Sequence, residues 1–193
     1  MSSGATLEAG ARLRLFLALV LPDEVGTQLV AWGDEHLVRG RRLEHFHVTL
    51  AFLGTRPRAE LGAILAVMRT AAAAVAEPFT LEPVRYRETR SVGMLVLDDP
   101  TGEATRLAER LQASLETLGC YRREARPWLP HVTVLRFRER PRLIPTLPEL
   151  GPFAPSEAAA FLSRLHRHDS AGGATYEILE KCPLNNSAGR MTT

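Results

Sequence analysis

Hydrophobic residues recur along this chain with two spacings, which predict strands alternating with helices. Apolar runs bounded by turn-forming residues predict strands over 12–20, 46–53, 79–86, 94–98, 131–137, 159–166 and 174–182. Stretches with helical periodicity predict helices over 23–37, 57–76 and 100–118. This order of elements predicts an α+β fold, with antiparallel sheets and helices packed on their outer faces.

Glycine and proline refine these predictions. Asp99 followed by Pro100 predicts the start of the third helix, and Gly119 predicts its end. Pro83 predicts that its strand lies at a sheet edge or carries a bulge, because proline donates no backbone hydrogen bond. Five prolines between 141 and 155 exclude a helix or a central strand, so this stretch is predicted to be a connecting loop.

The sequence His-Val-Thr followed by an aliphatic residue occurs twice, at His47–Leu50 and at His131–Val134. Successive side chains of a strand point to opposite faces, so each copy would carry its His and its Thr on one face. If the two strands lie side by side, two imidazoles and two hydroxyls form the walls of one polar cleft. A predicted helix precedes each copy. The chain is therefore predicted to form two pseudo-symmetric lobes around a central cleft.

Paired imidazoles are suited to acid–base chemistry. An imidazole has a pKa of about 6.5, so one ring can donate a proton while the other accepts one at neutral pH. The hydroxyls of Thr49 and Thr133, together with an arginine, would hold an oxyanion such as phosphate. Arg136 is a candidate, but it lies five residues after His131. It therefore needs a β-bulge or the strand end to reach the same face.

The composition predicts a folded protein of the cytoplasm. Hydrophobic residues make up 45% of the 193 residues, and no apolar run reaches the roughly 18 residues of a membrane span. Acidic residues follow the apolar run Leu15–Leu21 almost at once, so we interpret this run as a strand and not as a signal peptide. Cys120 and Cys182 form no CxxC motif, which indicates a reducing compartment, although a disulfide between them stays open.

The length predicts one bilobal domain over 11–183, with flexible termini at 1–10 and 184–193. We expect a monomer without membrane association. The net charge of +2 indicates no large basic surface, but every cation except Lys181 is an arginine. Arginines gather before each motif and could bind a nucleic-acid backbone or simply be solvated; they are Arg39, Arg41 and Arg42, and Arg122, Arg123 and Arg126.

The chain resembles the two-histidine (2H) phosphoesterase superfamily, specifically the LigT-like RNA 2′,3′-cyclic phosphodiesterases, formerly called 2′-5′ RNA ligases. The resemblance rests on the ordered set Arg14–Ala18 with Leu21-Pro22, His47–Gly54, Pro130–Arg136, and the closing strands with Ser163 and Tyr176. It covers nearly the whole chain. The chain departs from the family at Tyr86–Gly93, where a glycine-rich stretch ending in Phe-Pro is common, and around Arg39–Arg42, where a tryptophan is frequent.

The resemblance implies hydrolysis of 2′,3′-cyclic phosphate at RNA ends, giving 2′-phosphomonoesters. His47 matches the proton donor to the leaving ribose oxygen, and His131 matches the base that activates water. No metal and no cofactor is implied. Small cyclic nucleotides are an alternative substrate.

The same resemblance implies roles for four further residues. Thr49 and Thr133 match the hydroxyls that bind the non-bridging oxygens of the phosphate, and Arg136 matches the arginine beside the second motif. Phe52 matches an aromatic side chain against which a terminal base can stack.

Three alternatives to this hydrolase stay open: a zinc hydrolase, a non-catalytic module that binds RNA or a nucleotide, and a 2′-5′ RNA ligase. A zinc site would use His47 and His131, or the pair His45-x-His47 near Glu44, but the chain has no HExxH motif. Binding alone would not need both histidines and both threonines. The ligase would run the same chemistry in reverse. We interpret His45, His166 and His168 as surface residues, although the last two could also bind a metal.

Overall fold

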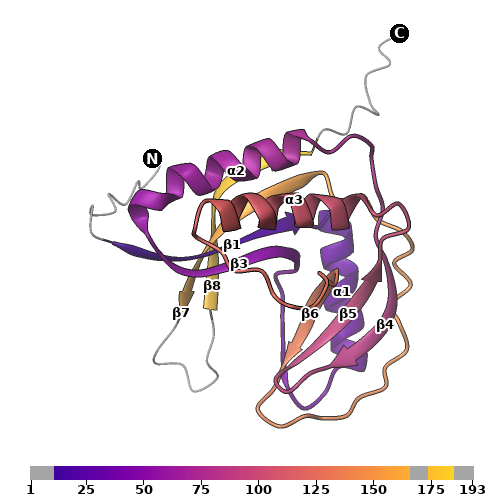
Figure 1. The fold of residues 1–193 in the computed structure, drawn as a ribbon. Coiled ribbons are helices and arrows are strands. Elements are labelled where there is room, and N and C mark those ends of the chain that lie inside the picture. The colour runs from indigo at the N-terminus through magenta and orange to yellow at the C-terminus, as the bar shows by residue number, and fades with distance from the viewer. Residues whose placement is uncertain (1–10, 166–173, 185–193) are drawn as a thin grey trace, which may run out of the picture.

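The computed structural model describes residues 11–165 and 174–184 (Figure 1). Its strands are β1 (Arg12–Val20), β2 (Arg41–Arg42), β3 (His47–Pro57), β4 (Glu82–Glu88), β5 (Val92–Asp98), β6 (His131–Arg136), β7 (Glu157–Leu165) and β8 (Ala174–Pro183). Its helices are α1 (Asp23–His36), α2 (Leu61–Ala73) and α3 (Glu103–Thr117), with a short 3-10 helix η1 (Arg58–Glu60) before α2. The predicted α+β class is confirmed.

All strand pairs are antiparallel and form one sheet in the order β4-β5-β6-β3-β1-β7-β8, with β2 paired to β6. β3 and β6 are joined by a single residue pair in the described part of the chain, Val48 with Val132. The sheet therefore has two halves that meet at this pair: one contains β1, β3, β7 and β8, and the other contains β2, β4, β5 and β6. Each half contains one of the two motif strands.

The helices tie the two halves together. Figure 1 shows α2 and α3 above the half that contains β3, and α1 behind β5 and β6. From α3, the buried Gln112 Nε2 donates to the Leu50 carbonyl on β3 at 2.8 Å. From α1, Leu29 and Gly33 lie around the same small cavity as Val134 of β6. Helix α3 thus covers the half that contains β3, and α1 covers the half that contains β6.

Strand β1 separates the hydrophobic core from the face that carries the motifs. Its odd-numbered leucines, Leu13 to Leu19, are buried in the main core. Phe16 and Ala18 lie in a second, smaller cluster on the opposite face, together with Ala159 and Phe161 of β7. Fully burying one leucine side chain contributes about 1.5–3 kcal/mol to folding. Because the leucine face of β1 packs into the main core, the face that carries Phe16 and Ala18 is the one that can contribute to the site.

Several local predictions are confirmed. Pro83 lies both on an edge strand, β4, and at a shift in the pairing of β4 with β5. The loop 141–155 contains no helix or strand apart from an isolated bridge at Phe153. Gly119 follows α3 with a φ of 77°. Cys120 and Cys182 are buried free thiols, which closes the disulfide alternative.

Other local predictions are wrong. The third helix begins at Glu103, not at residue 100, because Gly102 with a φ of 72° precedes it. Asp99 nevertheless caps this end, since its Oδ2 accepts hydrogen bonds from both the amide and the hydroxyl of Thr105 at 2.8 Å. Leu184 is buried and donates its amide to the Ser156 carbonyl, so the predicted flexible tail does not begin there.

The helix predicted over 57–76 is shorter, because η1 precedes α2 and α2 ends at Ala73. The strand predicted over 79–86 runs instead from Glu82 to Glu88. His166 and His168, residues 1–10 and residues 185–193 lie outside the described residues. No helix in the described part of the chain combines the length and the apolar character needed to cross a membrane.

Candidate active site

The two motif strands lie next to each other at the centre of the sheet. Val48 and Val132 are paired and buried, so the flanking residues of both strands project to the other face. We call this the histidine face: it carries His47 and Thr49 from β3, and His131 and Thr133 from β6. All four side chains are half-buried. The structure thus brings together the four motif residues that the sequence analysis selected.

Both strands carry a bulge at the third residue after the histidine. The pairing of β1 with β3 passes over Leu50, and the pairing of β5 with β6 passes over Val134. A bulge shifts the alternation of side chains by one residue. The burial pattern is identical over His47–Phe52 and over His131–Arg136: each motif ends with an exposed side chain five residues after its histidine.

These bulges bring Phe52 and Arg136 to the histidine face. The bulge that Arg136 required is therefore confirmed, and Phe52 reaches the face by the same device. Phe52 is 48% exposed, and the Arg14 guanidinium lies 4.8 Å from the centre of its ring. Such a cation–π contact holds one side of the ring against β1.

His47 lies among aromatic rings. The centres of the Phe16, Tyr176 and Phe161 rings are 4.8, 5.5 and 5.7 Å from that of the imidazole, and the Tyr176 ring is perpendicular to it. The pKa of His47 is lowered from 6.5 to about 4, first by burial, then by the positive charge of Arg136 and by the neighbouring imidazoles of His131 and His45. His47 is therefore neutral at pH 7 in the unliganded protein.

His131 has a different environment. Its Nδ1 lies 2.8 Å from the Leu129 carbonyl oxygen, which can only accept a hydrogen bond. Nδ1 therefore carries the proton, and in the neutral ring the lone pair is on Nε2. A proton acceptor at this position needs such a lone pair.

Two cavities open on the histidine face. One of about 430 Å³ is lined by His131, Thr49 and Phe52, together with Tyr121 and Trp128. The other, of about 460 Å³, is lined by His47, His45, Phe161 and Tyr176. The hydroxyls of Thr49 and Thr133 have no hydrogen-bond partner within the described residues, so they are available to a ligand.

The residues that sequence reasoning missed lie on other strands and in the segment before β6. Phe16 and Phe161 surround His47 from β1 and β7, and Tyr176 was noted only as part of the resemblance. Trp128 donates its indole hydrogen to the Thr49 carbonyl at 2.9 Å, which ties the segment before β6 to β3. Phe16 lies two residues after Arg14, so the alternation of a strand predicts both side chains on the same face of β1. No sequence signal indicated that β7 lies beside β1.

His45 is exposed, as predicted, and lies near the rim of the site. Within residues 11–165 and 174–184, no group of three or more His, Cys, Asp or Glu side chains is arranged to hold a metal ion. The zinc alternative therefore has no complete ligand set in this part of the protein.

The family model of the 2′-5′ RNA ligase superfamily matches residues 21–171. The chain belongs to this superfamily. An RNA 2′,3′-cyclic phosphodiesterase of Thermus thermophilus is 34% identical over 194 residues, which cover 92% of this chain and 93% of the relative. An enzyme of the same name from Escherichia coli (strain K12) is 33% identical over 131 residues, which cover 64% of this chain and 71% of that protein. Superfamily membership and these relatives identify the chain as a hydrolase.

The solved structures agree with this membership. The crystal structure of E. coli LigT complexed with 3′-AMP superposes with a TM-score of 0.78 at 25% identity, covering 91% of this chain and 100% of that one. A crystal structure from Thermus thermophilus has a TM-score of 0.73 at 30% identity, with the same coverage. The LigT-like resemblance seen in the sequence is thus confirmed for the family and for the fold.

Proposed function

We propose that this member of the superfamily hydrolyses RNA 2′,3′-cyclic phosphodiester ends to 2′-phosphomonoesters, without a metal, by paired acid–base catalysis. One observation carries the proposal: two strands with the same bulge present a histidine, a threonine and a fifth-position side chain on one face. The names of the relatives support the substrate class, since both are called RNA 2′,3′-cyclic phosphodiesterase.

The proposed reaction uses each histidine once. His131 Nε2 removes a proton from water, and the water oxygen attacks phosphorus. The bond between phosphorus and the ribose O3′ breaks, and protonated His47 gives its proton to this oxygen. The product carries a 2′-phosphate and a 3′-hydroxyl. His131 is then protonated and His47 neutral, and exchange with solvent restores the starting state.

The low pKa of His47 sets a condition for this reaction, because the donor must be protonated when the P–O bond breaks. The positive charge of Arg136 is the second cause of the low pKa, after burial. A cyclic phosphate carries one negative charge, which would offset Arg136 and raise the pKa of His47. We propose that the substrate itself helps to protonate its donor, and that Thr49 and Thr133 bind the non-bridging oxygens.

The test uses an oligoribonucleotide with a 2′,3′-cyclic phosphate end and the purified protein in excess EDTA. We expect opening of the ring, and end-group analysis should find only the 2′-phosphate. Chelation that abolishes turnover would contradict the metal-independent mechanism, and a 3′-phosphate product would reverse the proposed bond cleavage. Binding without turnover by the wild-type protein would favour a non-catalytic module.

The name of the superfamily favours 2′-5′ ligation as the second candidate. The two histidines would keep their roles, with His131 as the base for an attacking 5′-hydroxyl in place of water, and His47 as the acid for the leaving ribose O3′. Adding a 5′-hydroxyl oligonucleotide to the assay tests this reaction. A ligated product that forms faster than the hydrolysed one would make ligation the main activity.

A further inference from the structure

A cavity of about 610 Å³ lies beside Arg136, at the end of β6. Five arginines and one carboxylate line it, and we call it the arginine basin; its charged residues are Arg39, Arg41, Arg136, Arg138, Arg140 and Glu139. Arg136 also acts on His47 through its charge. The basin therefore begins at the candidate active site and extends away from it.

Two arginines of the basin face each other across strands. Arg41 of β2 is paired with Arg136 of β6, so their side chains project to the same face. This approach depends on Gly40, because a Cβ there would lie 2.9 Å from both the Arg136 carbonyl oxygen and the Leu135 side chain. Like charges directly opposite each other destabilise a sheet. An anion between them would remove this cost.

No carboxylate in the described part of the chain forms an ion pair with Arg39, Arg41 or Arg136. The neighbouring Arg42 shows the contrast. It faces away from the basin, and its Nε lies 3.0 Å from Asp34 Oδ1 on α1. The arginine cluster that precedes the first motif in the sequence is thus divided: Arg42 contacts α1, whereas Arg39 and Arg41 face an open cavity.

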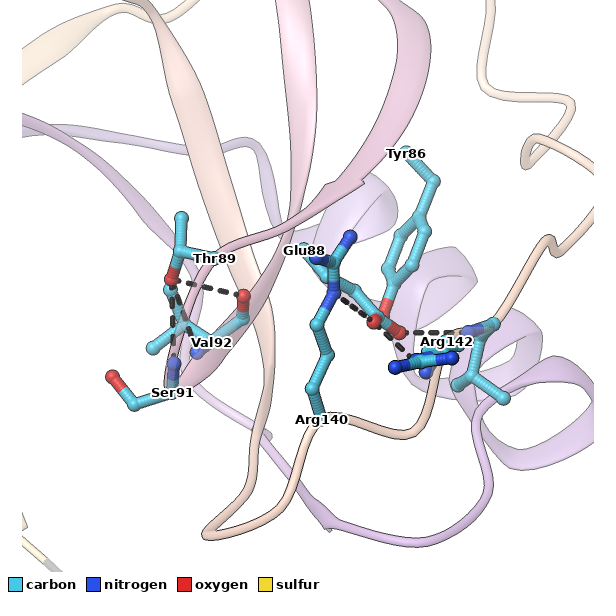
Figure 2. A network of polar contacts seen from close by, with 8 residues as sticks. Tyr86, Glu88, Thr89, Ser91, Val92, Arg140 and Arg142 are labelled. Carbon is cyan, nitrogen blue, oxygen red and sulfur yellow. Dashed lines mark hydrogen bonds and ion pairs between the residues drawn. The ribbon is translucent and has the colours of Figure 1, made fainter.

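The wall of the basin is held by a buried carboxylate. Glu88 ends β4, and its side chain is only 2% exposed. It accepts hydrogen bonds from the amides of Arg142 at 2.9 Å and Leu143 at 2.8 Å, and from Arg140 Nε at 3.1 Å (Figure 2). Burial alone would raise the pKa of Glu88, but these bonds lower it overall, so the group is ionised.

A second wall is the turn between β4 and β5, which contributes Ser91 to the lining. Figure 2 shows the Thr89 hydroxyl bonded to Ser91 and Val92 within this turn. The Ser91 carbonyl accepts the amide of Phe137 at 3.0 Å, directly after β6. Both walls are therefore fixed by hydrogen bonds before any ligand arrives. A preformed cavity loses less free energy when it orders a ligand.

We propose that the arginine basin binds the phosphodiester backbone upstream of the terminal cyclic phosphate, so that the protein prefers RNA strands to mononucleotides. This inference rests on the proposed function. The planar guanidinium of arginine binds phosphate oxygens through two parallel hydrogen bonds. In this arrangement, Arg41, which is paired with Arg136 on the neighbouring strand, and Arg39, which lines the same cavity, would contact the phosphates that precede the terminal one.

The test compares two substrates, a short oligoribonucleotide ending in 2′,3′-cyclic phosphate and the corresponding mononucleoside 2′,3′-cyclic phosphate. We expect Arg41→Gln to raise KM for the oligonucleotide about 10-fold and to change the kinetics of the mononucleotide less than about 2-fold. The slope of log(kcat/KM) against log salt should also become shallower by about 0.7 for each phosphate that the variant no longer binds. Arg69→Gln is the matched control, because Arg69 lies on α2, away from the histidine face, and its replacement removes the same charge.

An equal increase in KM for both substrates in Arg41→Gln would place Arg41 at the terminal phosphate and overturn the inference. An unchanged KM and salt slope in both Arg41→Gln and the Arg39→Gln/Arg41→Gln double variant would overturn it as well. If the wild-type protein opens neither substrate, the proposed function fails. Fluorescence anisotropy with a 2′-phosphate-ended oligoribonucleotide then decides on the basin alone, through weaker binding to Arg41→Gln than to Arg69→Gln.

Discussion

The two motif strands have the same backbone but different surroundings. In β3 and in β6, a bulge three residues after the histidine places the fifth-position side chain on the histidine face. Around His47 lie the rings of Phe16, Phe161 and Tyr176, whereas His131 is hydrogen-bonded to a backbone carbonyl. A repeated backbone can therefore set the positions of two like groups, while the strands and segments around them give each group different neighbours.

The fifth position extends this difference. It is Phe52 in the first motif and Arg136 in the second. One side chain offers a flat apolar ring, and the other offers a charge. In the proposed enzyme, the first would contact a base and the second the phosphate. Variants at the histidines and at the two fifth positions test this division.

The largest effect should come from the histidines. We expect His47→Gln and His131→Gln each to lower kcat by about 10²–10⁴-fold, because each removes one proton transfer. The double variant should lose little more than the worse single variant, since the two groups act as a unit. Steady-state kinetics on a cyclic-phosphate oligonucleotide measures all three. A single variant that keeps wild-type kcat would end the paired mechanism.

The fifth positions should differ in kind. Arg136→Gln should lower kcat/KM about 10- to 100-fold for every substrate, because it removes a charged hydrogen bond to phosphate. Phe52→Ala should act mainly on KM, by about 5- to 20-fold, because base stacking is a binding contribution. Kinetics with substrates of different terminal bases separates the two effects. If both variants change the same kinetic constant equally, the proposed division of roles is wrong.

The pKa of His47 should respond to charge. NMR titration of the unliganded protein should give a midpoint of about 4, well below that of an ordinary histidine. Inorganic phosphate should raise this midpoint, and so should Arg136→Gln, since an added negative charge and a lost positive charge act in the same direction. Phe52→Ala is the control and should leave the midpoint unchanged. A His47 midpoint that changes neither with phosphate nor in Arg136→Gln would contradict the proposal that the substrate helps to protonate His47.

The smallest effect concerns stability. The pKa of His47 is lowered in the folded protein, so the unfolded chain binds more protons between about pH 4 and 6.5. Above pH 6.5, His47 is neutral in both the folded and the unfolded protein and does not lower the free energy of unfolding. As the pH falls towards 4, the unfolded chain takes up the proton first, so the free energy of unfolding decreases. We expect this loss to be roughly 2 kcal/mol in the wild type and absent in His47→Gln. Urea unfolding at several pH values measures it, and parallel pH dependences in the two proteins would argue against the buried neutral state.

The motif strands show how far sequence reasoning reached. The alternation of β-strands placed each His and Thr on one face, and the odd spacing of Arg136 required the bulge that the structure contains. Phe52 also lies five residues after its histidine, so the same reasoning would have predicted its face, although Phe52 was selected only by resemblance. The start of α3 was misjudged because a Pro after an Asp usually begins a helix, but here the left-handed Gly102 intervenes.

The pattern of apolar and polar residues was sufficient to predict the α+β class, the two motif strands and the face that each His and Thr share, because side-chain alternation is a local property of an extended backbone. Three features became visible only in the folded protein: β3 and β6 are neighbours, aromatic rings from β1, β7 and β8 surround His47, and Arg41 lies opposite Arg136. These contacts join residues far apart in the chain. They depend on packing of the whole core, which no local pattern encodes.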